Sequence, residues 1–205
     1  MSEVVESEPM AEPAADEVMA GPDDVVAGPD DVSAGATAAP TPEPATVAAF
    51  VADRLRRAGV RWAFTVPGES FLPLMEAFEA VGIHVVATRH EGAAAHMAEA
   101  HAQLTGRPAV AMGTRAVGAA NLAIGIHTAM ADSTPMFAIV GGVETGAQGR
   151  EAFQEVDLAT TIGGLAKWAA APLDAAAAAG AVDEAVVPAL GGRPGPVLLA
   201  IPEDL

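Results

Sequence analysis

The stretch Thr88-Arg89-His90-Glu91-Gly92-Ala93-Ala94-Ala95-His96-Met97-Ala98 decides how the rest of the chain is interpreted. It places one carboxylate, Glu91, between an apolar run typical of a strand and an alanine-rich run that favours a helix from about Gly92. Open α/β sheets keep their ligands at such strand-to-helix crevices, where low polarity should disfavour a charged carboxyl group. Glu91 is therefore a candidate acid–base residue. The alternative is a first-turn glutamate that only interacts favourably with the helix dipole.

The alternation of strand and helix continues on both sides of this stretch. Strand-like runs fall at residues 62–66, 83–87, 109–112, 136–140, 165–169 and 197–201. Helical runs fall between Thr46 and Gly59 and at residues 71–80, 93–104, 117–130 and 175–190. Near-continuous apolar strands separated by helices indicate a parallel sheet covered on both faces. We predict a three-layer α/β/α sandwich over residues 46–205, with a six-stranded, mainly parallel sheet.

Composition excludes several classes of protein. The 205 residues suffice for one sizeable domain, and the absence of cysteine excludes disulfides and thiolate metal sites. The net charge of −17 is concentrated in residues 1–45, which hold eleven acidic and no basic side chains and are expected to form a disordered, Pro- and Ala-rich tail. No basic patch is visible, which argues against nucleic-acid binding. No long apolar run and no basic leader occur, so we expect a cytoplasmic protein without a membrane partner.

Glycine-rich turns and acidic residues follow the predicted strands, where a parallel sheet places its ligands. These turns are Val66-Pro67-Gly68-Glu69-Ser70, residues 113–121 and Gly141-Gly142-Val143-Glu144. A zinc site is not expected, because the histidine after His90-Glu91 is His96, six positions on, and a zinc-protease helix needs closer spacing. We predict no metal site in this chain. Dinucleotide, P-loop and nucleophile-elbow signatures are also absent from the sequence.

Several stretches between Val47 and Leu205 resemble the N-terminal, pyrimidine-binding domain of thiamine diphosphate-dependent enzymes, most closely the acetolactate synthase-like group. They occur in the order and at the spacing of that family. They are Phe64-Thr65-Val66-Pro67-Gly68, residues 89–98, Asp132-Ser133-Thr134-Pro135, Glu151-Ala152-Phe153-Gln154-Glu155-Val156-Asp157 and Gly192-Arg193-Pro194-Gly195-Pro196-Val197.

This resemblance implies three catalytic side chains. The carboxyl group of Glu91 would bond a ring nitrogen of the aminopyrimidine of thiamine diphosphate and so activate the cofactor. Glu69 would be a second acid–base group, and Gln154 would lie near the substrate or the cofactor. An exposed turn is the alternative for Glu69, and a capping or packing hydrogen bond is the alternative for Gln154.

The resemblance also implies a set of cofactor-binding residues. Pro67 and Gly68 would form a turn that lets the backbone approach the cofactor, although an ordinary Pro-Gly turn is the alternative. Thr114 and Asn121 belong to the segment that resembles the family's glycine-rich pyrimidine loop. For Asn121 a capping or packing hydrogen bond is again the rival interpretation.

The chain departs from the family pattern at three places. Arg115 stands where the family usually has a small serine, so this segment need not hold the ring in the same way. Lys167 is retained, but Leu173 stands where the family has an arginine that contacts FAD, which weakens the expectation of a flavin. The Gly-Asp-Gly motif of the domain that binds diphosphate and Mg²⁺ does not occur in this sequence.

Two functions remain open from the sequence. The first is the pyrimidine-binding part of an acetolactate synthase-like 2-oxo acid decarboxylase or carboligase. It would need a diphosphate-binding domain, with its Mg²⁺, on another chain of a homo- or hetero-oligomer or in a missing C-terminal region. The second is a non-catalytic interaction or regulatory module, or a remnant of such an enzyme.

Overall fold

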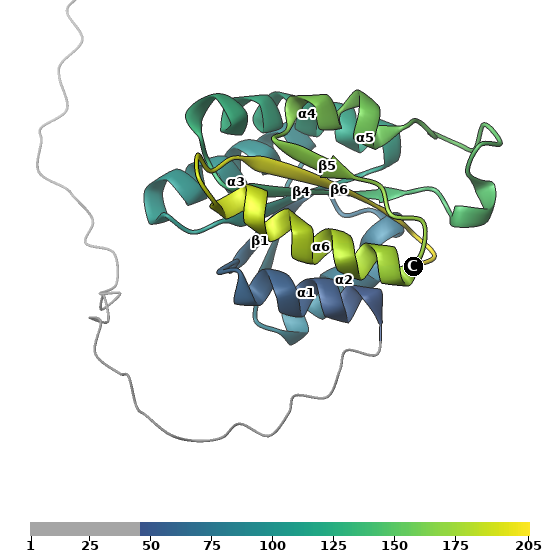
Figure 1. Cartoon of the computed structure of the whole chain (residues 1–205), viewed down its shortest axis with the longest axis horizontal. Helices are drawn as coiled ribbons and strands as arrows, with labels where there is room; N and C mark the ends of the chain where they lie inside the picture. Colours follow the sequence, from purple (N-terminus) through teal and green to yellow (C-terminus); the bar gives the residue numbers. More distant parts are fainter. Residues whose placement is uncertain (1–45) are drawn as a thin grey trace, which may run out of the picture. The chain divides into compact units, whose positions relative to one another are not determined.

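The computed structural model describes residues 46–205 (Figure 1). The predicted acidic tail, residues 1–45, lies outside the described residues. The helices are α1 (Val47–Arg57), α2 (Leu72–Ala80), α3 (Glu91–Thr105), α4 (Arg115–Asp132), α5 (Leu158–Thr161) and α6 (Ala175–Leu190). The strands are β1 (Trp62–Thr65), β2 (His84–Ala87), β3 (Ala109–Thr114), β4 (Met136–Gly142), β5 (Trp168–Ala170) and β6 (Pro196–Pro202).

All six strands join one parallel sheet in the order β2-β1-β3-β4-β6-β5. The register pairs Trp62 with His84 between β1 and β2, and Met136 with both Ala109 and Pro196 in the centre. The central strands β3, β4 and β6 are buried almost throughout, as both faces of the sheet are covered. The predicted α/β/α sandwich is therefore confirmed, with a sheet that is entirely rather than mainly parallel.

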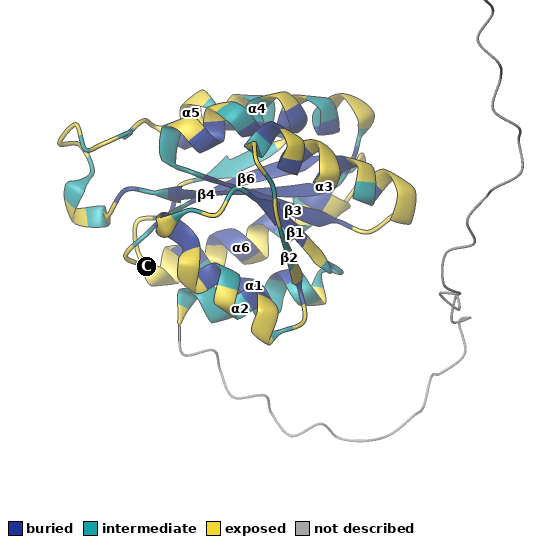
Figure 2. Cartoon of the chain, turned by 180° about the vertical axis from the view of Figure 1, so that it is seen from behind, coloured by how far each residue is buried: buried dark blue, intermediate teal, exposed yellow. Residues whose placement is uncertain are grey.

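Two apolar cores lie on opposite faces of the sheet (Figure 2). Helices α1, α2 and α6 cover one face with large side chains such as Leu55 and Phe78. Helices α3 and α4 cover the other face with small ones, including Ala94 and Ala98, beside Leu122. The small side chains allow the latter helices to approach each other and the sheet closely.

The junction between β3 and α4 differs from the predicted boundaries. The sequence places the strand end at Met112 and the helix start at Val117, whereas β3 continues to Thr114 and α4 begins at Arg115. Arg115 has a positive φ of 49°, so the chain turns within a single residue and no glycine-rich loop separates the two elements. Helix α3 likewise begins at Glu91, one or two residues before the predicted start at Gly92 or Ala93.

The fifth strand is shorter than predicted. A 3₁₀ turn occupies Gly163–Leu165, and β5 begins only at Trp168. Within the described part of the chain, no helix combines the length and hydropathy that a membrane crossing requires.

Candidate functional site

Three neighbouring strands deliver the predicted site residues to one edge of the sheet. Strands β2, β1 and β3 are adjacent and parallel, so their carboxyl ends meet. Glu91 follows β2, the Pro67-Gly68 turn follows β1, and Thr114 ends β3. The topology therefore places together residues that lie up to 47 positions apart in the sequence.

Glu91 is the first residue of α3 and is half-buried. The preceding residue, His90, caps the helix with its Nδ1, which accepts from the backbone N–H of Gly92 at 3.0 Å. The Oε2 of Glu91 accepts a hydrogen bond from Nδ2 of Asn121 on α4 at 2.8 Å. The side-chain amide of Asn121 on α4 thus fixes the carboxylate of Glu91 on α3. The surroundings of Glu91 are more polar than the sequence alone indicates.

Two closely packed glycines lie beside the other carboxylate oxygen of Glu91. A Cβ atom on Gly118 would lie 3.4 Å from Oε1 of Glu91. The same Cβ would lie 2.7 Å from the carbonyl carbon of Gly113, so β3 and the first turn of α4 touch through their backbones. Glycine at both positions lets β3 and α4 pack this closely beside Oε1 of Glu91.

Gly68 is required for space and not for its backbone conformation. Its φ of −142° is extended, which any residue can adopt. A Cβ at this position would lie 1.8 Å from Oγ1 of Thr114, so only glycine fits without a shift. That hydroxyl is buried and has no hydrogen-bond partner among residues 46–205, which leaves a donor and acceptor available to a ligand. Pro67 is exposed at the rim.

Arg115, the residue after Thr114, forms ion pairs with two glutamates. Its Nη2 lies 2.9 Å and 3.1 Å from the two carboxylate oxygens of Glu203, just beyond β6, and 3.4 Å from Oε1 of Glu69. The side chain of Arg115 is only 13% exposed, whereas that of Glu69 is 73% exposed. Glu69 therefore contacts Arg115, and its predicted role as a second acid–base group remains a prediction.

The family described as "Thiamine pyrophosphate enzyme, N-terminal TPP binding domain" matches residues 45–161, more than half of the chain. The chain belongs to this family. The resemblance found in the sequence is thereby confirmed.

Acetolactate synthases are among the relatives of this thiamine pyrophosphate family member. The chain is 40% identical over 168 residues to the acetolactate synthase large subunit of Parasynechococcus marenigrum, covering 80% of the chain and 27% of that protein. It is 36% identical over 154 residues to the mitochondrial acetolactate synthase of Schizosaccharomyces pombe, covering 75% and 23% respectively. The chain thus spans about a quarter of the length of the curated relatives it matches.

The residues at the β2-β1-β3 edge fit the aminopyrimidine of the family's cofactor. A carboxyl group and an unpartnered buried hydroxyl are polar groups of the kind that a heterocycle with nitrogen donors and acceptors needs. Glu91, Asn121 and Thr114 are the side chains that would hold it. Glu91, which is half-buried, lines neither of two cavities found in residues 46–205.

Gln154 contacts the first turn of α4 through its backbone carbonyl group. Its carbonyl accepts from the N–H of Ala116 in the first turn of α4 at 3.2 Å, and its φ of 59° is left-handed. Glu155, which sequence reasoning did not single out, organises this segment. Its carboxylate accepts from the backbone N–H groups of Gly149 and Ala152, and these bonds hold the pKa of Glu155 below its ordinary value.

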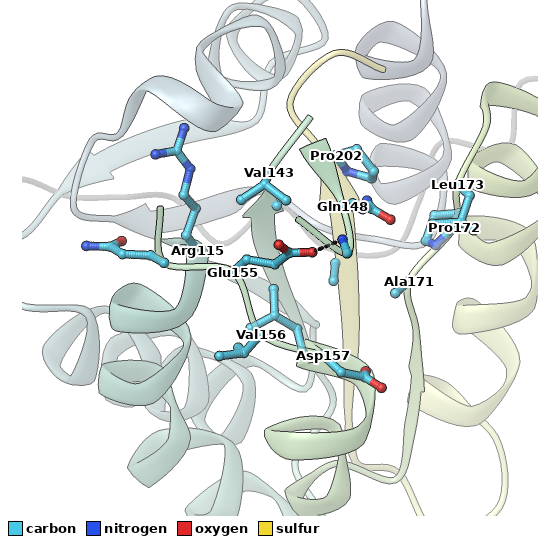
Figure 3. Close-up of a pocket in the computed structure, with 15 residues that line it drawn as sticks. Arg115, Val143, Gln148, Glu155, Val156, Asp157, Ala171, Pro172, Leu173 and Pro202 are labelled. Atoms are coloured by element: carbon cyan, nitrogen blue, oxygen red, sulfur yellow. Dashed lines mark hydrogen bonds between the residues drawn. The ribbon is translucent and has the colours of Figure 1, made fainter. Parts of the chain in front are cut away.

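A cavity of about 310 Å³ separates this segment from the ends of β4, β5 and β6 (Figure 3). Figure 3 shows Glu155 turned toward the neighbouring backbone, to which it is bonded, and Asp157 directed away from Glu155. The lining combines apolar residues with Arg115, two glutamines and the acidic residues Glu155 and Asp157. The lining residues include Arg115, Val143, Gln148, Gln154, Val156, Leu158, Pro172, Leu173 and Pro202.

Lys167 forms three hydrogen bonds with backbone carbonyl groups. Its Nζ donates to the carbonyls of Pro188, Gly191 and Arg193 at 2.7 Å, 3.0 Å and 2.7 Å, at the end of α6. Leu173, which stands at the position of the family's FAD-contacting arginine, is 61% exposed on the cavity rim. The inference that this chain is a doubtful FAD binder stays a prediction from the sequence.

Proposed function

We propose that this chain binds the aminopyrimidine end of thiamine diphosphate and that Glu91 is the acid that activates the cofactor. The supporting observation is the fixed position of the Glu91 carboxylate, which Asn121 holds at the carboxyl edge of the sheet. The chain would act as part of an acetolactate synthase-like 2-oxo acid decarboxylase or carboligase. Membership of the family and similarity to acetolactate synthases support this proposal.

The residues of this chain would have separate roles in orienting the cofactor and in proton transfer. When bound, thiamine diphosphate supplies the electron sink for decarboxylation, and the protein supplies orientation and proton handling. Asn121 fixes Oε2 of Glu91, while Oε1, which accepts no hydrogen bond within residues 46–205, holds or releases the proton. Gly68 and Gly118 would position Thr114 and Glu91, because each lets its neighbours pack without the clash that a side chain would cause.

The remaining cofactor contacts would come from elsewhere. We propose that a diphosphate-binding domain, on another chain or in another part of a longer polypeptide, holds the phosphates and Mg²⁺. The greater length of the relatives supports this division. Glu69 and Gln154 would face the substrate side, next to Arg115 and the neighbouring cavity.

Replacing Glu91 with glutamine tests the proposed function. Glutamine keeps the shape and can still accept from Asn121, but it cannot exchange a proton. With the diphosphate-binding domain present, we expect activity on a 2-oxo acid to fall by about 100-fold or more, with thiamine diphosphate binding measured by calorimetry nearly retained. Glu79→Gln, at an exposed position on α2, is the matched control.

The outcome also separates the two candidate functions. Normal turnover by Glu91→Gln would exclude the proposed role of this residue. Failure of the wild-type chain to bind thiamine diphosphate and Mg²⁺, even with a diphosphate-binding domain, would favour the non-catalytic interaction module.

A further inference from the structure

The two ends of the parallel sheet carry opposite charge. The turns that lead from a helix into the next strand hold four basic side chains and no acidic one. These turns are residues 58–61, 81–83, 106–108, 133–135, 162–167 and 191–195. The segments that follow the strands hold eight acidic and two basic side chains. These segments are residues 66–71, 88–90, 143–157, 171–174 and 203–205.

The four basic residues of the first set are Arg61, Arg107, Lys167 and Arg193, and we call them the amino edge. They precede β1, β3, β5 and β6, which lie in one row of the sheet together with β4. At about 4.8 Å between neighbouring strands, the row from β1 to β5 is about 19 Å long. Arg107, Lys167 and Arg193 are exposed and Arg61 is half-buried. The sheet therefore arranges cations that are far apart in the sequence along one line.

Uncharged groups hold three of these cations in place. Arg61 and Lys167 donate to backbone carbonyl groups, and Arg193 donates to two carbonyl groups and to the hydroxyl of Ser133. Within residues 46–205, no carboxylate lies within ion-pair distance of the amino edge. The positive charge of these side chains is thus not neutralised by an acidic partner in the described chain.

The helix dipoles reduce this charge but do not cancel it. Helices α1, α2, α3, α4 and α6 all end at this side of the sheet, and each C-terminus carries about half a negative charge. Five such ends offset about 2.5 of the four positive charges. The last turns of these helices hold three basic and two acidic residues, which leaves the sign unchanged. The amino edge is therefore a positive surface on a chain of net charge −17.

Arg107 is the member of the amino edge that is free to bind a partner. It is exposed, and its side chain forms no hydrogen bond or ion pair with the described residues. Its charge acts on His101 of α3, whose pKa is lowered by burial and, to a smaller extent, by the neighbouring Arg107. The imidazole of His101 therefore senses the charge at this position.

We propose that the amino edge docks an extended, carboxylate-rich segment of a partner protein. A row of about 19 Å matches about six residues of extended chain at about 3.3 Å each, and opposite charges steer the two surfaces together. Three of the four cations already donate to neutral oxygens, so the contact relies on charge and not on the bidentate hydrogen bonds that favour phosphate. The strongly acidic remainder of the chain repels a long nucleic acid. This inference does not depend on the proposed cofactor chemistry.

Fluorescence anisotropy of a labelled poly-glutamate peptide of about eight residues, titrated with the full chain, tests the proposal. We expect binding at about 10 mM salt, with the affinity falling by about tenfold or more at about 150 mM, because salt screens exposed charges. A poly-serine peptide of the same length is the uncharged control and should not bind. Every variant retains residues 1–45, so their acidic side chains affect all titrations equally.

Substitutions locate the contact. Arg107→Glu should weaken peptide binding by about fivefold or more at low salt, whereas Arg107→Lys, which keeps the charge, should retain most of it. Arg150→Glu makes the same change of charge at an exposed position beyond the opposite end of the sheet and should bind as the wild type does. Circular dichroism checks that each variant is folded.

The titration of His101 followed by NMR gives an independent readout. Carboxylates bound beside Arg107 offset its charge, so saturating peptide should raise the pKa of His101 toward its ordinary value. Arg107→Glu should raise that pKa without peptide. The proposal is overturned if the wild type binds no peptide at low salt, if Arg107→Glu binds as tightly as the wild type, or if binding leaves the pKa of His101 unchanged. Tighter binding of a single-stranded DNA of equal charge would also overturn it, because the edge would then favour phosphate.

Discussion

Replacing Asn121 with aspartate tests the contact on which the candidate site depends. The wild-type Nδ2 donates to Oε2 of Glu91 over 2.8 Å, and the variant places a second carboxylate at that point. Two unit charges about 3 Å apart repel by about 5 kcal/mol at an effective dielectric of about 20 and by about 1.4 kcal/mol in water. Both side chains are half-buried, so we expect the free energy of unfolding to fall by about 2–3 kcal/mol near pH 8.

Urea unfolding followed by circular dichroism at low protein concentration measures this loss. As the pH falls, the facing carboxyl groups of the variant take up a shared proton, which removes the repulsion. The charged pair is disfavoured only in the folded state, so the destabilisation is complete at high pH and declines as the pH falls. Asn121→Ala separates the lost hydrogen bond from the repulsion.

Ala120→Asp is the matched control, because it adds the same charge one residue away at an exposed position of α4. The reasoning is refuted if Asn121→Asp is no less stable than Ala120→Asp near pH 8, or if its deficit persists near pH 4.

Three further predictions concern the surroundings of this contact. Gly68→Ala should lower the free energy of unfolding by about 1–3 kcal/mol, because its Cβ collides with Thr114, and adding Thr114→Ala should recover part of the loss in thermal melts. Arg115→Ala leaves Glu203 without its partner and should cost about 1–3 kcal/mol in urea titrations, with Arg115→Lys recovering only part. The pKa of Glu155 is lowered by backbone N–H bonds, so its stabilisation of the segment is present above the ordinary carboxyl pKa and lost as the pH falls. The protection factors of the amides there, which correct for the intrinsic slowing of exchange in acid, should therefore fall as the pH falls, but not in Glu155→Gln.

Each of these has an outcome that contradicts it. A wild-type melting temperature for Gly68→Ala would mean that the Thr114 hydroxyl moves aside freely. Equal stability of Arg115→Ala and Arg115→Lys would show that charge at this position contributes nothing. An unchanged acid response in Glu155→Gln would assign the pH dependence to another carboxylate.

The architecture could be predicted because the positions of strands and helices depend on local sequence patterns. Apolar runs separated by amphipathic helices determine the strand and helix positions, and the parallel arrangement follows from burial on both faces. The order of the strands could not be read from the same pattern. Strand β6 lies beside β4, with β5 outside it, and that placement depends on contacts between residues more than 20 positions apart.

The sequence indicates individual candidate residues of the site, but it does not indicate which of them contact each other. Glu91 and Asn121 were both selected from the sequence, yet their hydrogen bond joins two helices across 30 positions. The contact of Arg115 with Glu203 spans 88 positions, and no local spacing rule predicts it. Glu155 was overlooked because its role is to bind backbone N–H groups, which side-chain patterns do not reveal.

The close crossing of α3 and α4 has a consequence for motion. Because Gly125 meets Ala95 with no room for a methyl group, the two helices cannot slide past each other without breaking their contact. Glu91 and Asn121 should therefore travel as one rigid body, and any hinge that opens or closes the neighbourhood must lie outside them.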